Sequence, residues 1–379
     1  MKSNYKRIGD FIRLVDERNT GLKVQELIGL TISKQFIPSV ANTIGSDMEN
    51  YKIIRQNQFA CSLMQVRRDK KIPVALLKDK EVAIISQAYP IFEIINTKHI
   101  LPEYLMMWFS RKEFDREACF YAVGGVRGSL EWEDFSNMKL PVPSIEKQKE
   151  IVKEYNVILN RIELNNQLIQ KLEETAQAIY KQWFVDGVDK DNLPEGWRVG
   201  KLRELCEYSN KRIQIEKLNL NNYISTENMI QNRGGITKAN NLPNTNNFTN
   251  FEIGNILISN IRPYFKKIWL ADFNGGCSND VLCLVPFNNI PSLYLYQILE
   301  KDNFFDYVMA GSKGTKMPRG DKKWIMNYPA IIPDKKILEK FNLILTNIQK
   351  KIFLMKQEEI KLLELEDFFV SKLATEGRG

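Results

Sequence analysis

Residues 144–186 alternate apolar and polar side chains with the spacing of one long helix. From Ile151 to Trp183, residues taken alternately four and three apart are apolar or aromatic, except Asn165. This repeat keeps the apolar residues on one side of a helix, and that side must be buried against another helix. Asn165 within it either specifies the register of the two helices or marks a position where they splay apart. Ser144 is suited to the N-cap. We predict a helix of about 43 residues, roughly 65 Å long, too long for the core of a small domain.

A second stretch, residues 334–374, repeats this pattern about 190 residues further along the chain. Near its end the apolar seam slips, because Ile360 and Leu363 compete there with Glu359 and Glu366. The simplest partner for each helix is the other, and we predict that the two form an antiparallel coiled coil. Its seam contains Ile151, Ile158, Ile162, Ile169, Leu172 and Ile179 of the first helix and Leu345, Ile348, Ile352 and Leu362 of the second.

The stretches in front of these helices also repeat each other. FACSLMQVRR at 59–68 corresponds to ILISNIRPYF at 256–265, and the loop 311–324 takes the place of the glycine-rich loop 124–129. A period that covers a globular part and a helix is an internal duplication. In the first stretch, apolar runs predict two strands and one helix, over 52–62, 81–95 and 101–117.

We therefore predict an α+β protein, in which two duplicated globular domains are joined by two long helices with pseudo-twofold symmetry. The length of 379 residues allows two domains with separate cores. The predicted boundaries are 1–143 for the first domain, 144–186 for its helix, 187–200 for a linker, 201–333 for the second domain, 334–374 for the second helix and 375–379 for a tail.

The charge is concentrated in the globular stretches. The chain carries a formal net charge of +8 and has a pI of about 9.0. Lys and Arg exceed Asp and Glu in both globular stretches, whereas the helices are near neutral. Two basic modules indicate a polyanionic partner such as nucleic acid; a general contribution to solubility is the alternative.

The sequence offers little catalytic chemistry. His99 is the single histidine, and 311–316 (GSKGTK) has the wrong spacing for a phosphate-binding loop. No CxxC pair suggests zinc, and five scattered cysteines argue against a disulfide framework, so Cys277 and Cys283 are expected in the core. No apolar run of 18 residues or signal-peptide core occurs, and we expect a cytoplasmic protein without a membrane segment. The sequence therefore favours recognition over catalysis, with no metal and no cofactor bound by this chain.

Four segments carry a family resemblance: LPVPSIEKQKEI at 140–151, AIYKQWFVD at 178–186, LPEGWRVGKLREL at 193–205, and GNILISNIRPYFKKI at 254–268 followed by GGCSNDVLCLVP. Together with the duplication, they resemble the specificity subunit of type I restriction–modification systems over essentially the whole chain. Two departures from the family pattern occur at the starts of the helices. Lys147 separates Glu146 from Gln148, and IIPDKKILEKF at 331–341 has no Gln.

The resemblance implies that each globular domain is a target-recognition domain, which binds one half of a split double-stranded DNA target. It implies a coiled coil that fixes the spacing of the half-sites, which for two readers on one face of the duplex is tied to the helical repeat of ~34 Å. It also implies two modification (methyltransferase) subunits, with S-adenosylmethionine, and restriction subunits, with ATP, as partners. The specificity subunit itself catalyses nothing.

Direct readout of DNA needs polar or basic side chains that reach base edges, and Lys or Arg that hold phosphates. Arg127, Lys316 and Arg319 are favoured, whereas Arg262, directly before Pro263 in a repeated motif, is also explained by support of the fold. For each residue, a solvated surface charge is the alternative. The candidates are Gln65, Arg67, Arg68, Lys70, Lys71, Gln87, Arg127 and Ser129 in the first domain and Asn260, Arg262, Tyr264, Lys266, Lys267, Asn279, Lys313, Thr315, Lys316 and Arg319 in the second.

Three other functions compete with this interpretation. A coiled-coil scaffold would use its basic modules to bind protein, but polar glycine loops at equivalent places in both repeats count against it. A nuclease would need a site that the near absence of histidine and of metal-ligand spacing makes improbable. The specificity subunit of a related restriction or phage-defence system would differ only in how its partners are arranged.

Overall fold

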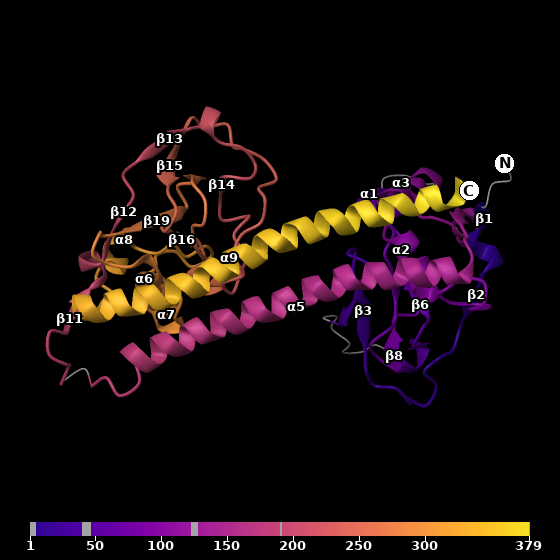
Figure 1. Ribbon diagram of the computed structural model, residues 1–379, viewed down its shortest axis with the longest axis horizontal. Coiled ribbons are helices and arrows are strands. Elements are labelled where there is room, and N and C mark those ends of the chain that lie inside the picture. Colours follow the sequence, from indigo (N-terminus) through magenta and orange to yellow (C-terminus); the bar gives the residue numbers. More distant parts are fainter. Residues whose placement is uncertain (1–4, 40–46, 123–127, 190–191, 379) are drawn as a thin grey trace. The chain divides into compact units, whose positions relative to one another are not determined.

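The computed structural model describes residues 5–39, 47–122, 128–189 and 192–378, without the side chains of 376–378 (Figure 1). Two compact units divide the chain, the first made of residues 1–164 and 358–379 and the second of residues 165–357. The predicted long helices are confirmed as α5 (Ile145–Phe184) and α9 (Lys335–Lys372), each of which contributes one part to each unit.

An antiparallel four-stranded sheet forms the centre of the first unit, in the order β2-β9-β6-β7. Smaller pairs β1–β10, β3–β4 and β5–β8 accompany it, with short helices after the strands. The strands are β1 (Tyr5–Arg7), β2 (Ile12–Val15), β3 (Ile28–Leu30), β4 (Phe36–Pro38), β5 (Lys52–Arg55), β6 (Phe59–Cys61), β7 (Val74–Leu76), β8 (Val82–Ile85), β9 (Ile91–Ile94) and β10 (Lys139–Pro141). The helices are η1 (Ile8–Asp10), η2 (Met48–Asn50), α1 (Val66–Asp69), α2 (Pro102–Phe109), α3 (Lys112–Tyr121) and α4 (Trp132–Asn137).

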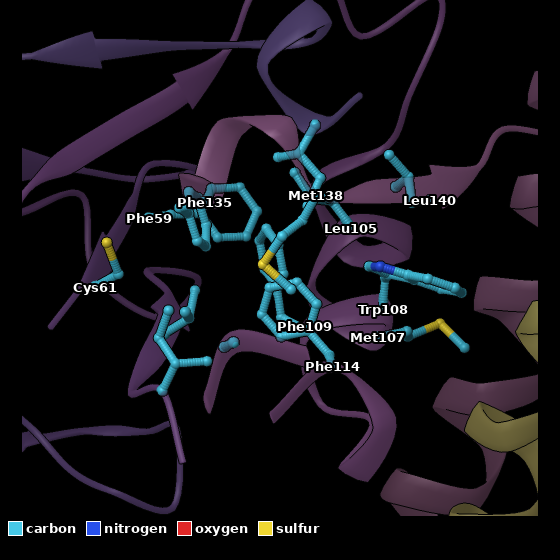
Figure 2. Packing of buried hydrophobic residues seen from close by; sticks show 14 of the residues in the cluster. Phe59, Cys61, Leu105, Met107, Trp108, Phe109, Phe114, Phe135, Met138 and Leu140 are labelled. Carbon is cyan, nitrogen blue, oxygen red and sulfur yellow. The ribbon is translucent and has the colours of Figure 1, made fainter. Parts of the chain in front are cut away.

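An aromatic cluster packs helices α2, α3 and α4 onto this sheet (Figure 2). Phe59 of β6 and Phe92 of β9 stack with ring centres 5.0 Å apart, and Phe109 of α2 stands edge-on to both. Phe114 and Phe135 complete the cluster from α3 and α4. Because these rings are almost fully buried, they fix helices α2, α3 and α4 against the sheet.

The second unit repeats this plan. Its central sheet has the order β12-β19-β16-β17, β11 pairs with β20, and a second sheet has the order β13-β15-β18-β14. The strands are β11 (Arg198–Lys201), β12 (Cys206–Tyr208), β13 (Arg212–Gln214), β14 (Tyr223–Ile224), β15 (Asn247–Phe251), β16 (Ile256–Ser259), β17 (Ile268–Leu270), β18 (Gly275–Cys277), β19 (Val281–Pro286) and β20 (Pro329–Ile332). The helices are η3 (Leu202–Glu204), η4 (Ile215–Lys217), η5 (Pro263–Phe265), α6 (Ser292–Leu299), α7 (Asp302–Ala310) and α8 (Lys322–Ile325), and η6 (Leu373–Arg378) follows α9 in the first unit.

Helices α5 and α9 run antiparallel within each unit. In the first unit, Tyr155 of α5 contacts Glu366 and Arg161 contacts Glu358, so residue numbers rise along one helix as they fall along the other. In the second unit, Ile169 packs against Ile352 and Met355. Every predicted seam residue is buried or half-buried, and Asn165 is buried among them.

Three sequence-based assignments of secondary structure need correction. The strand predicted over 52–62 is two strands, β5 and β6, because Asn57 turns the chain with a φ of 67°. The strand predicted over 81–95 is likewise β8 and β9, separated by a turn before Pro90. The helix predicted over 101–117 breaks at Arg111, whose extended backbone allows its guanidinium to lie 4.0 Å from the ring centre of Trp108.

Candidate nucleic-acid interface

A turn with two left-handed residues follows the inner strand in both repeats. In the second unit, Arg262 and Lys266 bracket η5 with φ angles of 49° and 50°. In the first unit, Gln65 and Lys70 bracket α1 with φ angles of 63° and 52°. Side chains with a Cβ adopt this conformation at a cost of roughly 1–2 kcal/mol, and residues held there cluster at functional sites. The repeated geometry therefore marks these turns as candidate binding elements.

In the second unit, the glycine-containing loop is hydrogen-bonded to this turn. The backbone N–H of Arg262 donates to Pro318 at 2.8 Å, and that of Gly320 donates to Asn260 at 3.2 Å. A Cβ on Gly320 would lie 2.8 Å from the side-chain oxygen of Asn260, so the close approach requires glycine. Lys313 and Arg319 exchange two backbone hydrogen bonds of 3.0 Å, which hold the loop as a small hairpin.

The hairpin presents its basic side chains at the surface, some of them oriented by carboxylates. The Arg319 guanidinium lies 3.2 Å from Asp280, and the Lys313 amine lies 2.9 Å from Asp321. The hydrogen bond from Lys313 and the backbone N–H groups of α8 lower the pKa of Asp321 to about 2. Thr315 and Lys316 are exposed at the tip. The arrangement is suited to phosphates and base edges.

The remaining candidates of the second unit differ in exposure. Tyr264 is exposed, whereas Lys266 is half-buried and lies 2.8 Å from Asp302. The amine of Lys267 donates to a backbone carbonyl at 2.6 Å, and burial lowers its pKa. Arg262 is half-buried, with its guanidinium 6.0 Å from the ring centre of Phe265. The contacts of Lys267 and Arg262 favour support of the turn, and Asn279 is exposed beside Asp280.

In the first unit, the same type of turn carries a more open set of candidates. The backbone N–H of Arg67 donates to Gly128 at 3.2 Å, which ties the following loop to the turn as in the second unit. Arg67, Lys70 and Lys71 are exposed, and Arg68 is paired with neighbouring Asp69 at 2.6 Å. The other candidates are half-buried Gln65, exposed Ser129 and exposed Gln87 in the turn between β8 and β9. Arg127 lies outside the described residues.

Two cations near the hairpin of the second unit were missed by the sequence-based selection. Arg212 and Lys322 lie with Asn279 around a small polar hollow. They are far apart along the chain, and each looks like an ordinary surface charge. The sequence signal for Lys322 was the Lys322-Lys323 pair near the end of the predicted loop 311–324.

Among the described residues, no group of three or more His, Cys, Asp or Glu side chains is placed to hold a metal ion. In the same part of the chain, no helix is long and apolar enough to span a membrane. Cys277 and Cys283 are buried in β18 and β19, where burial raises the pKa of both thiols.

Comparisons with known proteins agree with this architecture. Residues 63–174 and 194–364 match the type I restriction modification DNA specificity domain. The type I restriction enzyme MjaIX specificity subunit of Methanocaldococcus jannaschii is 21% identical over 313 residues, which cover 74% of this chain and 70% of that protein. The HindI specificity subunit of Haemophilus influenzae is 30% identical over 110 residues, which cover 28% of this chain and 24% of that protein.

A solved structure supports the fold independently of close sequence similarity. The crystal structure of the type I restriction–modification S subunit from M. genitalium has a TM-score of 0.58 at 15% identity and covers 98% of this chain and 96% of that one. Two copies of a DNA specificity domain, each of which includes most of a long helix, define a DNA-recognition protein. The chain belongs to the family of type I restriction–modification specificity subunits, whose role in the enzyme is recognition and not catalysis, as its sequence predicted.

Proposed function

We propose that each globular repeat of this chain reads one half of a bipartite DNA target and that helices α5 and α9 set the gap between the halves. The observation that carries the proposal is the repeated turn with two left-handed residues, which bears basic or polar side chains in both repeats. A duplicated reader suits a split target, since each copy can bind its own half-site independently.

The distribution of charge supports the same assignment of surfaces. Hairpin 313–319 of the second unit and turn 65–71 of the first present exposed Lys and Arg, whereas the cysteines that could act as nucleophiles are mostly buried. Phosphate contacts by such side chains give affinity, and polar groups beside them give sequence preference. We assign these two surfaces to DNA.

The proposal includes partners that match those of the family. Two modification subunits would dock on this chain and methylate adenine with S-adenosylmethionine, and restriction subunits would add ATP-driven translocation and cleavage, in the cytoplasm. The chain itself would hold neither S-adenosylmethionine nor ATP. Its own contribution would be to place the half-sites relative to the methyltransferases.

Methylation mapping tests the proposal. The chain is co-expressed with the modification subunit expected to be encoded beside it, and host DNA is sequenced for methyladenine. We expect a bipartite motif with a fixed gap. Exchange of residues 201–333 for the corresponding domain of a relative should change one half of the motif and leave the other. A soluble complex that produces no methylation would favour the scaffold or a differently partnered specificity subunit.

A further inference from the structure

A small polar hollow lies in the second unit between strands β12, β13, β15 and β19 and the start of α8. Its volume is about 180 Å³. Arg212 of β13 and Lys322 of α8 contribute its two cations, and Thr249 and Asn279 contribute neutral hydrogen-bonding groups. Its size and polar lining are suited to one small charged group and not to an extended apolar ligand.

The two cations are held in place by neutral contacts. The guanidinium of Arg212 donates to the hydroxyl of Thr249 at 3.1 Å, and the amine of Lys322 lies 5.6 Å from the ring centre of Tyr208. Burial and Cys283 raise the pKa of the Cys277 thiol nearby, while Arg212 and Lys322 both oppose this increase. The positive charges of Arg212 and Lys322 therefore both act on the region around Cys277.

Three carboxylates near the hollow are paired with other cations. None of the described residues that line it is acidic. Asp280 is paired with Arg319, Asp321 with Lys313 and Glu252 with Lys211. Within the described part of the chain, no ion pair engages Arg212 or Lys322. The hollow therefore carries an uncompensated positive charge, which favours an anion.

The hollow also borders the candidate interface. Asn279 directly precedes Asp280, the partner of Arg319, and Lys322 directly follows Asp321, the partner of Lys313. An anion in the hollow would thus lie next to the hairpin that presents Lys316. DNA is a polyanion that could supply such a group while it contacts the hairpin.

We propose that this hollow binds one backbone phosphate of DNA through Arg212 and Lys322, with Asn279 as a hydrogen-bond donor. The phosphodiester would fix the register of the second unit on the duplex, independently of the base sequence. This inference rests on the proposed function, because it requires that the chain bind DNA.

A polar hollow of the first unit has different chemistry. A hollow beside β2 and α4 contains Asp10 and Glu133 as well as Arg7 and Arg13. Arg7 is paired there with Asp10, and Arg13 is paired with Glu93. Because both of its arginines are paired with carboxylates, this hollow is not suited to a phosphate, and we confine the proposed anchor to the second repeat.

Salt-dependent binding to a mixed-sequence DNA duplex tests the anchor in the full chain. The Arg212→Gln, Lys322→Gln double variant is compared with a charge-matched control, Lys335→Gln with Lys340→Gln, on the exposed surface of α9. Loss of one phosphate contact should make the slope of log K against log[salt] shallower by about 0.9 and weaken binding at low salt. The control should retain the slope of the wild type.

Two further variants separate loss of charge from loss of structure. Arg212→Lys with Lys322→Arg keeps both charges and should restore the slope, whereas Asn279→Asp adds a carboxylate and should weaken binding as the double variant does. A methylphosphonate scan of the duplex should find one position that weakens the wild type and leaves the double variant unchanged.

The possible outcomes distinguish the two proposals. If the wild type binds DNA and the double variant keeps its slope, the phosphate anchor is wrong while the DNA-recognition function stands. If the double variant loses affinity only for the motif found by methylation mapping and keeps the salt slope of the wild type, the hollow reads bases and the anchor is wrong. If the wild type binds no duplex at all, the proposed function fails and the anchor fails with it.

Discussion

The hydroxyl of Tyr155 on α5 donates a 2.7 Å hydrogen bond to the carboxylate of Glu366 on α9. This bond explains how an acidic residue occupies the seam where the sequence pattern slips. Ile360 and Leu363, the apolar competitors for that register, are 51% and 47% exposed. Burial and the bond to Glu366 raise the pKa of the Tyr155 hydroxyl, so it remains protonated and able to donate.

Tyr155→Phe should destabilise the first unit by about 1.5 kcal/mol, since it leaves a half-buried carboxylate without this donor. Urea denaturation followed by circular dichroism measures the change. In the double variant with Glu366→Leu, most of the loss should be recovered, because both polar partners are replaced by apolar groups. Additive losses in the double variant would contradict a direct role of the bond.

Gln148→Leu should lower the free energy of unfolding by about 3 kcal/mol. Leucine is the natural residue at the corresponding fourth position of α9, Leu338, but the surroundings of Gln148 differ. The buried Gln148 amide accepts from the N–H of Leu101 at 2.9 Å and donates to the carbonyls of His99 and Pro143. A leucine would leave these partly buried backbone groups without their partner. Thermal unfolding of this variant is compared with that of Lys147→Leu, an exposed neighbour expected to change stability by less than about 0.5 kcal/mol.

Gln65→Gly should stabilise the first unit by about 1 kcal/mol and weaken DNA binding at the same time. Glycine adopts the left-handed conformation without the Cβ penalty, while the variant loses a candidate DNA contact. Lys71 follows the left-handed residue Lys70 but does not itself have a positive φ. Lys71→Gly should therefore lower the free energy of unfolding by about 0.5–1 kcal/mol. Unfolding and binding are measured on the same preparations. A stabilised variant with unchanged affinity would remove Gln65 from the interface.

Arg319→Ala should weaken specific binding through the second half-site by roughly 5–150-fold if Arg319 contacts a base, corresponding to about 1–3 kcal/mol. If it holds a phosphate, binding to all sequences should weaken and the salt slope should fall by about one unit. Asp280→Asn, which removes the carboxylate partner of Arg319, should not reproduce either loss. Arg127→Ala is expected to act in the same way through the first half-site. If either variant binds DNA as tightly as the wild type at all salt concentrations, the substituted arginine does not contact DNA.

The second unit should lose stability as the pH rises from about 4.5 to about 7, because of Glu300. Burial raises the pKa of this carboxyl to about 7, and its Oε1 has no hydrogen-bond partner among the described residues. Below pH 4.5 it is protonated in both states; above that the unfolded chain ionises first, which favours unfolding by up to roughly 3 kcal/mol.

Glu300→Gln should remove this pH dependence and raise the stability at pH 8 above that of the wild type. Urea unfolding at pH 5 and pH 8 measures the effect in both proteins. Glu216→Gln replaces an exposed glutamate of the same unit and serves as the control. An equal pH dependence in wild type and Glu300→Gln would show that Glu300 is not responsible.

The features that sequence predicted best were periodic or repeated. The heptad spacing gave both long helices to within about two residues of their ends, because a buried seam leaves a strong period. The alignment of 59–68 with 256–265 placed Gln65 opposite Arg262, and the structure gives both residues the same left-handed conformation.

The features that sequence missed depend on tertiary contacts. The break at Arg111 depends on the ring of Trp108. The turn at Asn57 does carry a local signal, because Asn favours the left-handed conformation and lies in the polar run 55–58, but the strand prediction passed over it. Arg212 and Lys322 meet because β13 pairs with β15 and α8 follows the hairpin. Such convergence arises from sheet pairing between distant segments and leaves no short-range pattern in the chain.

The division of α9 between the two units has a consequence for synthesis on the ribosome. Val370 and Leu373 belong to the core of the first unit, and Tyr5 donates to the backbone of Ala374. The first 164 residues therefore emerge long before the segment that completes their core. At ~5–20 residues per second, they would wait roughly 10–40 s with apolar surface uncovered, a period in which a chaperone would protect the nascent chain.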